Sequence, residues 1–229
     1  MPGILYVVGT PIGNLKDITQ RAIEVLTEVD FVVAESRERA LKLLSHLEIK
    51  KPITTINTYS EESRTRSIVD QLKRGKGAAL ITAAGTPCIS DPGDKLVRGC
   101  LDAGIDVRAI PGPSAAIAAL STCGLSPDRF IFYGFLPLKK GKKRKILAEI
   151  LTGPYAVVLF ESPRRVQETL TLISELGEER MVAVYREMTK LHEETIRGPA
   201  GEVATTVCDR EGRGEYTIIV EGKRKQAPS

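Results

Sequence analysis

The stretch ILYVVGTPIGN, residues 4 to 14, decides the fold class of this chain. Five apolar or β-branched residues lead directly into Gly9-Thr10-Pro11, and a second glycine follows at Gly13. A strand, a glycine-bearing turn and then a helix is how α/β proteins present backbone amides to a ligand. The stretch therefore predicts a buried strand whose carboxyl end borders a binding site.

The same alternation of apolar strands and amphipathic helices continues to about residue 115. The apolar runs predict strands at 5–9, 31–35, 53–57, 77–85 and 105–111, and the helical spacing of apolar residues predicts helices at 17–29, 36–47, 63–75 and 94–104. Strands that alternate with helices indicate a parallel sheet covered on both faces.

The pattern changes in the second half of the chain. Helices are expected at 115–125, 143–151 and 164–176, and strands at 130–136, 155–162, 180–189, 193–197 and 215–221. The last strands follow one another without long helices, which favours antiparallel pairing. We expect an N-terminal parallel-sheet α/β domain at 1–112 and a C-terminal mixed-sheet α/β domain at 113–229, joined near residues 111–115.

Bulk composition excludes several classes of protein. No apolar run of the 229-residue chain approaches the roughly 18 to 20 residues of a membrane-spanning helix, and no secretory signal is visible at the N-terminus. The four cysteines are scattered without a CxxC pair, and there are only two histidines. We therefore expect a cytoplasmic protein with reduced thiols and no metal centre.

One charge run stands out, because KKGKKRK at 139–145 places six cations in seven residues. A charge run of this kind is ordinarily a solvated loop and first helical turn. The alternative is a surface that contacts phosphates.

Four turns rich in glycine, proline and serine follow predicted strands. They are GTPIGN (9–14), AAGTPCISDPG (83–93), IPGPSAA (110–116) and FESPRR (160–165). Any one of them has a purely structural explanation, but four at the carboxyl ends of strands predict a binding cleft.

The ligand of this predicted cleft is not an ordinary nucleotide. The first turn lacks the GK[ST] ending of a triphosphate-binding loop, and no GxGxxG stretch identifies a dinucleotide fold. Turns with few charged side chains suit a neutral or zwitterionic ligand that is held by main-chain groups.

Taken together, these motifs resemble the tetrapyrrole methylase-like (class III) S-adenosylmethionine-dependent methyltransferases. The resemblance covers nearly the whole chain and rests on LYVVGTPIGNLKDITQRAIEVL, AGTPCISDPG, IPGPSAAIAALSTCGL, DRFIFYGFLPLKKGKKR, LFESPRR and REMTKLHEETIRG. The first and last of these blocks are typical of the branch that methylates the 2′-oxygen of a cytidine ribose in small-subunit (16S) rRNA. The corrin and sirohaem enzymes share only the fold and the Gly-Pro turns.

The resemblance implies a two-lobed tetrapyrrole methylase fold that forms a homodimer and binds S-adenosyl-L-methionine in the cleft between its lobes. Carried over motif by motif, the cofactor-binding residues are Pro11, Ile12, Gly85, Thr86, Pro87, Ile89, Pro113, Ser114, Ala115, Phe160, Glu161 and Ser162.

A ribose 2′-hydroxyl is a poor nucleophile, so a base or a cation must remove or offset its proton. The candidates, in falling order, are Lys190, Glu187 and Glu161. Lys190 would either stabilise the developing alkoxide or, with a pKa lowered by burial, act as base. The alternative is that these residues only form salt bridges within REMTKLHEE.

If the partner is small-subunit rRNA or the ribosomal subunit, an RNA-binding surface is expected. Its candidate residues are Lys139, Lys140, Lys142, Lys143, Arg144, Lys145 and Arg164. Two other functions remain open: a methyltransferase of a small tetrapyrrole, and a non-catalytic rRNA-binding protein.

The chain departs from the usual family pattern at four places. Ser36 stands in the motif EDTR, Ala83 in SDAGTP, Tyr59 in an HxHNE-type loop and Arg164 in ESPHR.

Overall fold

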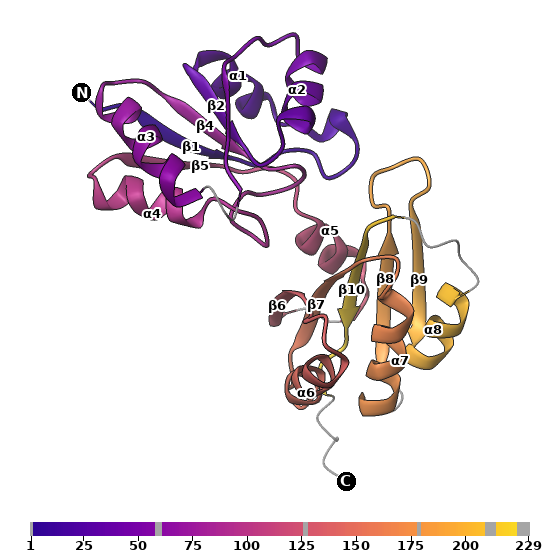
Figure 1. The fold of residues 1–229 in the computed structure, drawn as a ribbon. Coiled ribbons are helices and arrows are strands. Elements are labelled where there is room, and N and C mark those ends of the chain that lie inside the picture. Colours follow the sequence, from indigo (N-terminus) through magenta and orange to yellow (C-terminus); the bar gives the residue numbers. More distant parts are fainter. Residues whose placement is uncertain (1, 58–60, 126–127, 178–179, 209–213, 224–229) are drawn as a thin grey trace. The chain divides into compact units, whose positions relative to one another are not determined.

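A computed structural model describes residues 2–57, 61–125, 128–177, 180–208 and 214–223. The chain divides into two compact units, of which one ends at Ser114 and the other begins at Ala115. Each unit is built around its own five-stranded sheet (Figure 1).

The first unit is a parallel α/β sandwich. Its elements are β1 (Ile4–Val8), the 3₁₀ turn η1 (Leu15–Asp17), α1 (Gln20–Glu28), β2 (Phe31–Ala34), α2 (Arg37–His46), β3 (Ile53–Thr55), α3 (Glu61–Lys73), β4 (Ala78–Ile81), α4 (Asp94–Asp102) and β5 (Asp106–Ile110). The strand order is β3-β2-β4-β1-β5, and every neighbouring pair is parallel. The predicted parallel sheet is confirmed.

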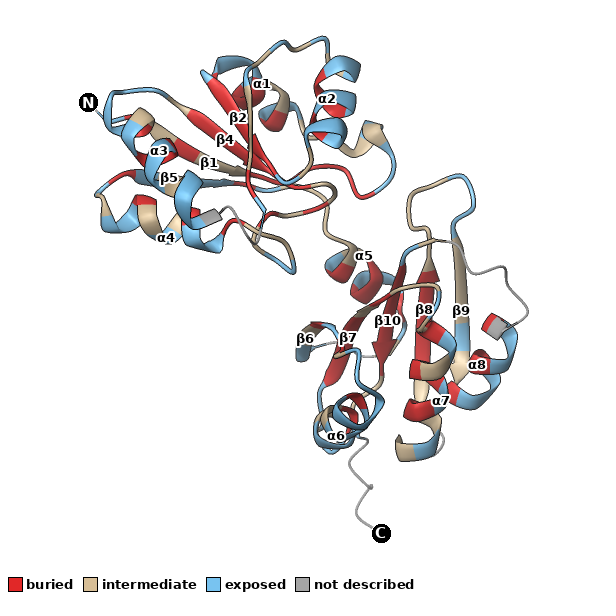
Figure 2. Cartoon of the chain, in the orientation of Figure 1, coloured by how far each residue is buried: buried red, intermediate tan, exposed pale blue. Residues whose placement is uncertain are grey.

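Both faces of this sheet are covered, because successive side chains of a strand point to opposite faces. Val32 and Ala34 of β2 pack with α1 and α2, whereas Phe31 and Val33 pack with α3 and α4. Figure 2 shows β2 and β4 buried along their length, whereas β1 mixes buried with intermediate residues. A strand buried on both faces is apolar throughout, which is why unbroken apolar runs in the sequence predicted these strands.

The second unit holds a mixed sheet. Its elements are α5 (Ala115–Thr122), β6 (Phe130–Phe135), α6 (Lys140–Ile150), β7 (Ala156–Glu161), α7 (Val166–Gly177), β8 (Met181–Arg186), β9 (Glu194–Pro199), α8 (Ala200–Cys208) and β10 (Tyr216–Val220). The order is β6-β7-β10-β8-β9, in which β6 and β7 are parallel and the other pairs are antiparallel. The predicted mixed sheet is confirmed.

Helices lie on both faces of this second sheet as well. Side chains of α6, α7 and α8 share one apolar cluster with the strands, and α5 packs on the opposite face through Ala116, Ala119 and Leu120. The Thr122 hydroxyl at the end of α5 lies 2.9 Å from the Tyr185 hydroxyl of β8. This contact fixes the end of α5 against the sheet.

Three local features differ from the sequence-based expectations. The first helix begins at Gln20 instead of residue 17, because the Thr19 side chain accepts from the Ala22 amide and caps it there. Helix α8 was not predicted, since AGEVATTVC is short and rich in glycine and threonine. Helix α6 begins at Lys140 and not at 143, so most of the basic run is helical.

Within the described ranges, no helix is both long and apolar enough to cross a membrane. The same residues contain no cluster of three or more His, Cys, Asp or Glu side chains that could hold a metal ion. Cys100 is buried, and this burial raises the pKa of its thiol to about 11.

Candidate functional site

Three of the four predicted turns meet at the carboxyl edge of the first sheet. The Gly9 amide donates to the Ile110 carbonyl at 3.0 Å, which joins the turn after β1 to the turn after β5. Thr10 and Gly85 exchange two backbone hydrogen bonds of 2.8 and 3.1 Å, which join the turn after β1 to the turn after β4. The convergence of these three turns follows from the parallel arrangement of β1, β4 and β5.

Glycine is required where two of these turns touch. A Cβ atom on Gly9 would lie 2.8 Å from the Gly112 Cα, and a Cβ on Gly112 would lie 2.7 Å from the Gly9 carbonyl oxygen. Backbone atoms on both sides cannot move apart without separating the strands. A side chain at either position would therefore force the two turns to shift apart, because main chain packs closely on main chain here.

Gly85 lies at the centre of the converging turns. It has a φ of +80°, and a Cβ placed on it would lie 3.5 Å from the Ile12 Cγ2 and 3.9 Å from the Pro113 carbonyl oxygen. Ile12, Gly85 and Pro113 come from three different turns and were all predicted as cofactor-binding residues. The structure brings these three together.

The turn after β4 contains two residues whose backbone conformation is strained. Cys88 and Ser90 have φ values of 68° and 67°, in the left-handed region that costs a non-glycine residue about 1 kcal/mol. Ile89 between them is exposed, whereas Pro87 is buried and Thr86 half-buried. Backbone strain of this kind concentrates at functional sites, where surrounding contacts hold it in place.

Thr82 is a feature of this edge that sequence reasoning missed. It ends the run that leads from β4 into the turn and is 6% exposed, yet its Oγ1 has no hydrogen-bond partner among the described residues. A buried hydroxyl without a partner costs free energy and suits a polar ligand group. Together with a turn set nearly devoid of charged side chains, it fits a zwitterionic ligand such as S-adenosylmethionine.

The fourth turn, 160–165, belongs to the second unit and is organised by a buried carboxylate. Glu161 is 2% exposed. Its Oε1 accepts from the Ser162 amide at 2.9 Å and its Oε2 accepts from the Thr169 hydroxyl at 2.7 Å. Both carboxylate oxygens of Glu161 accept hydrogen bonds from the protein, and these bonds hold the turn in shape. This arrangement disfavours Glu161 as the general base. That the turn faces the other three stays a prediction.

The prediction that Lys143 binds RNA was wrong. Its side chain is fully buried, and its ammonium donates to Glu168 Oε2 at 2.7 Å and to Thr169 Oγ1 at 3.4 Å. Thr169 in turn donates to Glu161, so Lys143 belongs to the network that holds the 160–165 turn. The Lys143 ammonium is also the first cause of a lowered pKa at Glu168.

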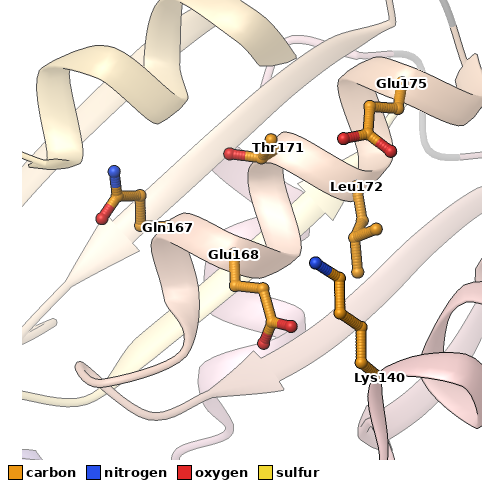
Figure 3. Close-up of a pocket in the computed structure, with 6 residues that line it drawn as sticks. All are labelled: Lys140, Gln167, Glu168, Thr171, Leu172 and Glu175. Atoms are coloured by element: carbon orange, nitrogen blue, oxygen red, sulfur yellow. The ribbon is translucent and has the colours of Figure 1, made fainter.

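The rest of the basic run is arranged unevenly on α6. Lys139, Lys140, Lys142 and Lys145 are exposed, and Arg144 is ion-paired with Glu175 of α7. A pocket of about 230 Å³ lies between α6 and α7. Figure 3 shows Lys140 extending into this pocket, toward the side of α7 that carries Glu168 and Glu175. These carboxylates reduce the positive potential beside Lys140, so the exposed Lys139, Lys142 and Lys145 dominate the surface charge of this helix.

Lys190 forms a compact ionic cluster in the β8–β9 hairpin. Its ammonium donates to Glu187 Oε1 and to Glu215 Oε2, both at 2.8 Å. The Glu187 side chain also accepts from the Glu215 amide at 2.9 Å. The predicted salt bridge between Lys190 and Glu187 is present, and a second partner, Glu215, precedes β10 and lies outside the motif considered from sequence. A catalytic role for Lys190 stays a prediction.

The charges around Lys190 decide its protonation state. Partial burial disfavours the ammonium, but the hydrogen bonds and charges of Glu187 and Glu215 outweigh it and hold the pKa of Lys190 above its ordinary 10.5. For Glu187 burial likewise opposes ionisation, and the bonds from Lys190 and the Glu215 amide outweigh it, so the pKa of this carboxyl is lowered. The raised pKa of Lys190 favours the first of its two predicted roles, a cation that stabilises an alkoxide, over the role of base.

Of the four departures from the family pattern, the structure explains one and places a second on the surface. Ser36 caps α2, since its side chain accepts from the Arg39 amide at 3.4 Å. Arg164 is exposed beside Arg165, which binds the Leu136 and Pro137 carbonyls. Nothing in the structure explains Ala83, and Tyr59 lies outside the described residues.

Two α/β units, one of which gathers glycine- and proline-rich turns at the carboxyl edge of its parallel sheet, define a methylase class of fold. The family model described as Tetrapyrrole (Corrin/Porphyrin) Methylases matches residues 4–204, and the chain belongs to this family. The resemblance inferred from the motifs is confirmed.

Two relatives are similar to this chain over nearly their whole length. A protein of Coprothermobacter proteolyticus named Ribosomal RNA small subunit methyltransferase I is 46% identical over 217 residues, which cover 95% of this chain and 97% of that protein. A protein of the same name from Thermotoga maritima is 43% identical over 221 residues, with coverage of 96% and 99%.

Solved structures of lower identity share the fold. Diphthine synthase superposes with a TM-score of 0.71 at 14% identity, covering 96% of this chain and 90% of that one. Uroporphyrin-III-C-methyltransferase from Thermus thermophilus superposes with a TM-score of 0.68 at 18% identity, covering 96% and 94%. At such identities the likeness concerns the fold alone.

Proposed function

We propose that this protein is an S-adenosyl-L-methionine-dependent methyltransferase that acts on the 2′-oxygen of a cytidine ribose in small-subunit rRNA. The observation that carries the proposal is the meeting of three glycine-proline turns around Gly85, in a chain 46% identical to a named small-subunit rRNA methyltransferase. The rRNA substrate is supported by that similarity, and the cytidine 2′-oxygen by the GTPIGNLKDIT and REMTKLHEE motifs.

The turns of the first unit are the proposed holder of the methyl donor. Ile12, Gly85 and Pro113 offer main-chain groups and apolar contacts, and the Thr82 hydroxyl offers a buried polar group. When bound, S-adenosylmethionine supplies a methyl group already activated by attachment to a sulfonium. The protein's task is then alignment, which intramolecular models value at about 7 to 11 kcal/mol.

Lys190 is the proposed cation that offsets charge developing on the acceptor oxygen. Its raised pKa keeps it protonated at neutral pH, and its two carboxylate partners fix the position of the ammonium. A fixed donor near a developing oxyanion needs no reorganisation during the reaction, which is the basis of electrostatic catalysis. Glu187 and Glu215 act as positioning residues for Lys190.

We further propose that the protein is a cytoplasmic homodimer whose partner is rRNA or the small subunit. The exposed lysines of α6 support a polyanionic partner, since Lys139, Lys142 and Lys145 form a basic surface next to the 160–165 turn's network. A small tetrapyrrole substrate needs no such surface. The non-catalytic alternative predicts no cofactor binding at all.

The decisive experiment measures tritiated methyl transfer onto unmodified small subunits and onto naked rRNA, followed by mapping of the product. Calorimetry with S-adenosylmethionine accompanies it, on the native protein and on Thr86→Arg. We expect Thr86→Arg to abolish cofactor binding in a folded protein, because the new side chain fills the space at the Gly85 turn. Thr27→Arg on the exposed side of α1 is the matched control and should bind normally.

Each other result has a definite meaning. A native protein that binds rRNA but no S-adenosylmethionine would establish the non-catalytic alternative. Methyl transfer to a tetrapyrrole but not to RNA would replace the proposed substrate. Cofactor binding that survives in folded Thr86→Arg would move the donor away from the converging turns.

A further inference from the structure

The end of β6 exposes apolar side chains directly before the basic start of α6. Phe135, the last residue of β6, is 55% exposed, and Leu138 three residues later is 83% exposed. A single exposed apolar residue is ordinary. Here, however, the exposed Lys139, Lys140 and Lys142 follow within the next seven residues, so an aromatic ring and a cluster of cations share one corner of the second unit.

The Phe135 ring is held in place although it is exposed. It packs edge to face against Phe160, with ring centroids 5.7 Å apart and planes at 62°, and Phe160 packs in the same way against Phe132. The backbone that follows is fixed as well, because Arg165 donates to the Leu136 carbonyl at 2.7 Å and to the Pro137 carbonyl at 3.0 Å. An exposed ring with a fixed orientation is ready to bind a flat partner without further ordering cost.

We infer that Phe135 is a stacking platform for an unpaired RNA base, seated beside the methyl donor. The combination of an exposed aromatic ring with neighbouring lysines is what single-stranded nucleic acid recognises, since bases stack on the ring and phosphates pair with the cations. The inference rests on the proposed function and adds to it a residue that positions the substrate strand.

The position of Phe135 connects this platform to the chemistry. Phe135 pairs with Phe160 in the parallel register of β6 and β7, and Phe160 is one of the proposed donor-binding residues. A base stacked on Phe135 would therefore lie next to a residue that is proposed to bind the donor. Stacking would orient the nucleotide whose ribose, or whose neighbour's ribose, is methylated.

The test compares Phe135→Ala with two matched variants. Phe130→Ala removes the same side chain from the opposite end of β6, where the ring is 43% exposed and about 16 Å away along the strand. Phe135→Tyr keeps an aromatic face. Affinity for fluorescently labelled, unmodified small-subunit rRNA is measured at several salt concentrations, and S-adenosylmethionine affinity is measured by calorimetry on the same proteins.

We expect Phe135→Ala to weaken RNA binding by about 5- to 150-fold, the range set by the loss of one base–aromatic stack. The dependence of affinity on salt should stay unchanged, because stacking releases no counterions. Phe135→Tyr should restore affinity, and Phe130→Ala should bind as the native protein does.

Several results would overturn the inference. If Phe135→Ala binds and methylates RNA normally, the platform is refuted while the proposed function stands. If RNA affinity and cofactor affinity fall by the same factor, Phe135 merely supports Phe160. If the native protein neither binds nor methylates rRNA, the proposed function and the inference fail together, and an exposed Phe135 would point to a protein partner.

Discussion

The two units of this protein build their candidate functional groups in opposite ways. In the first unit, the site is made of main chain: Gly9 touches Gly112, Thr10 bridges Gly85, and almost no charged side chain takes part. In the second unit, the corresponding elements are held by ion pairs, such as Lys143 with Glu168 and Lys190 with Glu187. Because main-chain groups are proposed to bind the methyl donor and charged side chains to act on the acceptor oxygen, substitutions can test the two roles separately.

Deleting the charge of Lys190 should have the largest effect. We expect Lys190→Ala to lower turnover by about 100- to 1,000-fold, as for the loss of one preorganised donor to a developing oxyanion. Its affinity for S-adenosylmethionine should change little, since Lys190 is not among the residues proposed to bind the donor. Steady-state kinetics and calorimetry measure the two effects, with Lys42→Ala on exposed α2 as control.

The same cluster makes a prediction about pH. The pKa of Glu187 is lowered from 4.5 and that of Lys190 is raised from 10.5, so the ion pair contributes stability above the first value and below the second. Native turnover should therefore show no titration of Lys190 between about pH 5 and pH 10. If the profile of turnover against pH shows a titration near neutrality that disappears in Lys190→Ala, Lys190 acts as the base. If Lys190→Ala lowers turnover and cofactor affinity equally, Lys190 belongs to the binding site.

Next in size is the effect of removing the buried lysine of the basic run. Lys143→Ala should lower the free energy of unfolding by about 3 kcal/mol, because it deletes a buried chain and leaves its polar partners unsatisfied. Lys142→Ala, one residue earlier but exposed, should change it by less than about 0.5 kcal/mol. Urea denaturation measures both.

RNA binding should show the reverse ranking of these two lysines. Lys142→Ala should reduce the slope of log affinity against log salt by about 0.7 to 0.9, the value of one phosphate contact. Lys143→Met keeps the buried methylenes and should leave the slope unchanged. A reduced slope in Lys143→Met would return Lys143 to the RNA-binding surface.

The smallest expected change is at the backbone contact of the first unit. Gly112→Ala should cost about 1 to 3 kcal/mol of stability through overpacking, since its Cβ would lie 2.7 Å from the Gly9 carbonyl oxygen. Cofactor affinity should fall with it, because the turns after β1 and β5 must separate. Gly141→Ala in α6, where no atom lies within 4 Å of the added Cβ, serves as control. If Gly112→Ala keeps native stability and native cofactor affinity, close main-chain packing does not hold the site of the first unit together.

The sequence predicted the strands, helices and turns that depend on neighbouring residues. It did not predict which side chains of a helix face the core, because this depends on where the helix begins. The six cations of 139–145 look equivalent in the sequence, but Lys143 and Leu147 are one helical turn apart and both buried. Had the helix been started at 140, this spacing would have placed Lys143 on the buried stripe of α6. The spacing of Lys143 and Leu147 thus contained the information, but it could be interpreted only with the correct first residue of the helix.

The sequence by itself determined the alternation of strands and helices, the parallel and antiparallel sheets, and the turns that need glycine or proline. These follow from backbone geometry and apolar periodicity, which act over a few neighbouring residues. Only the tertiary structure decided that Lys143 is buried against Thr169, that Glu215 joins Lys190, and that the Thr82 hydroxyl finds no partner within the described part of the chain. Such pairings join residues far apart in the chain, and a charged or polar group reveals its role only when its surroundings are assembled.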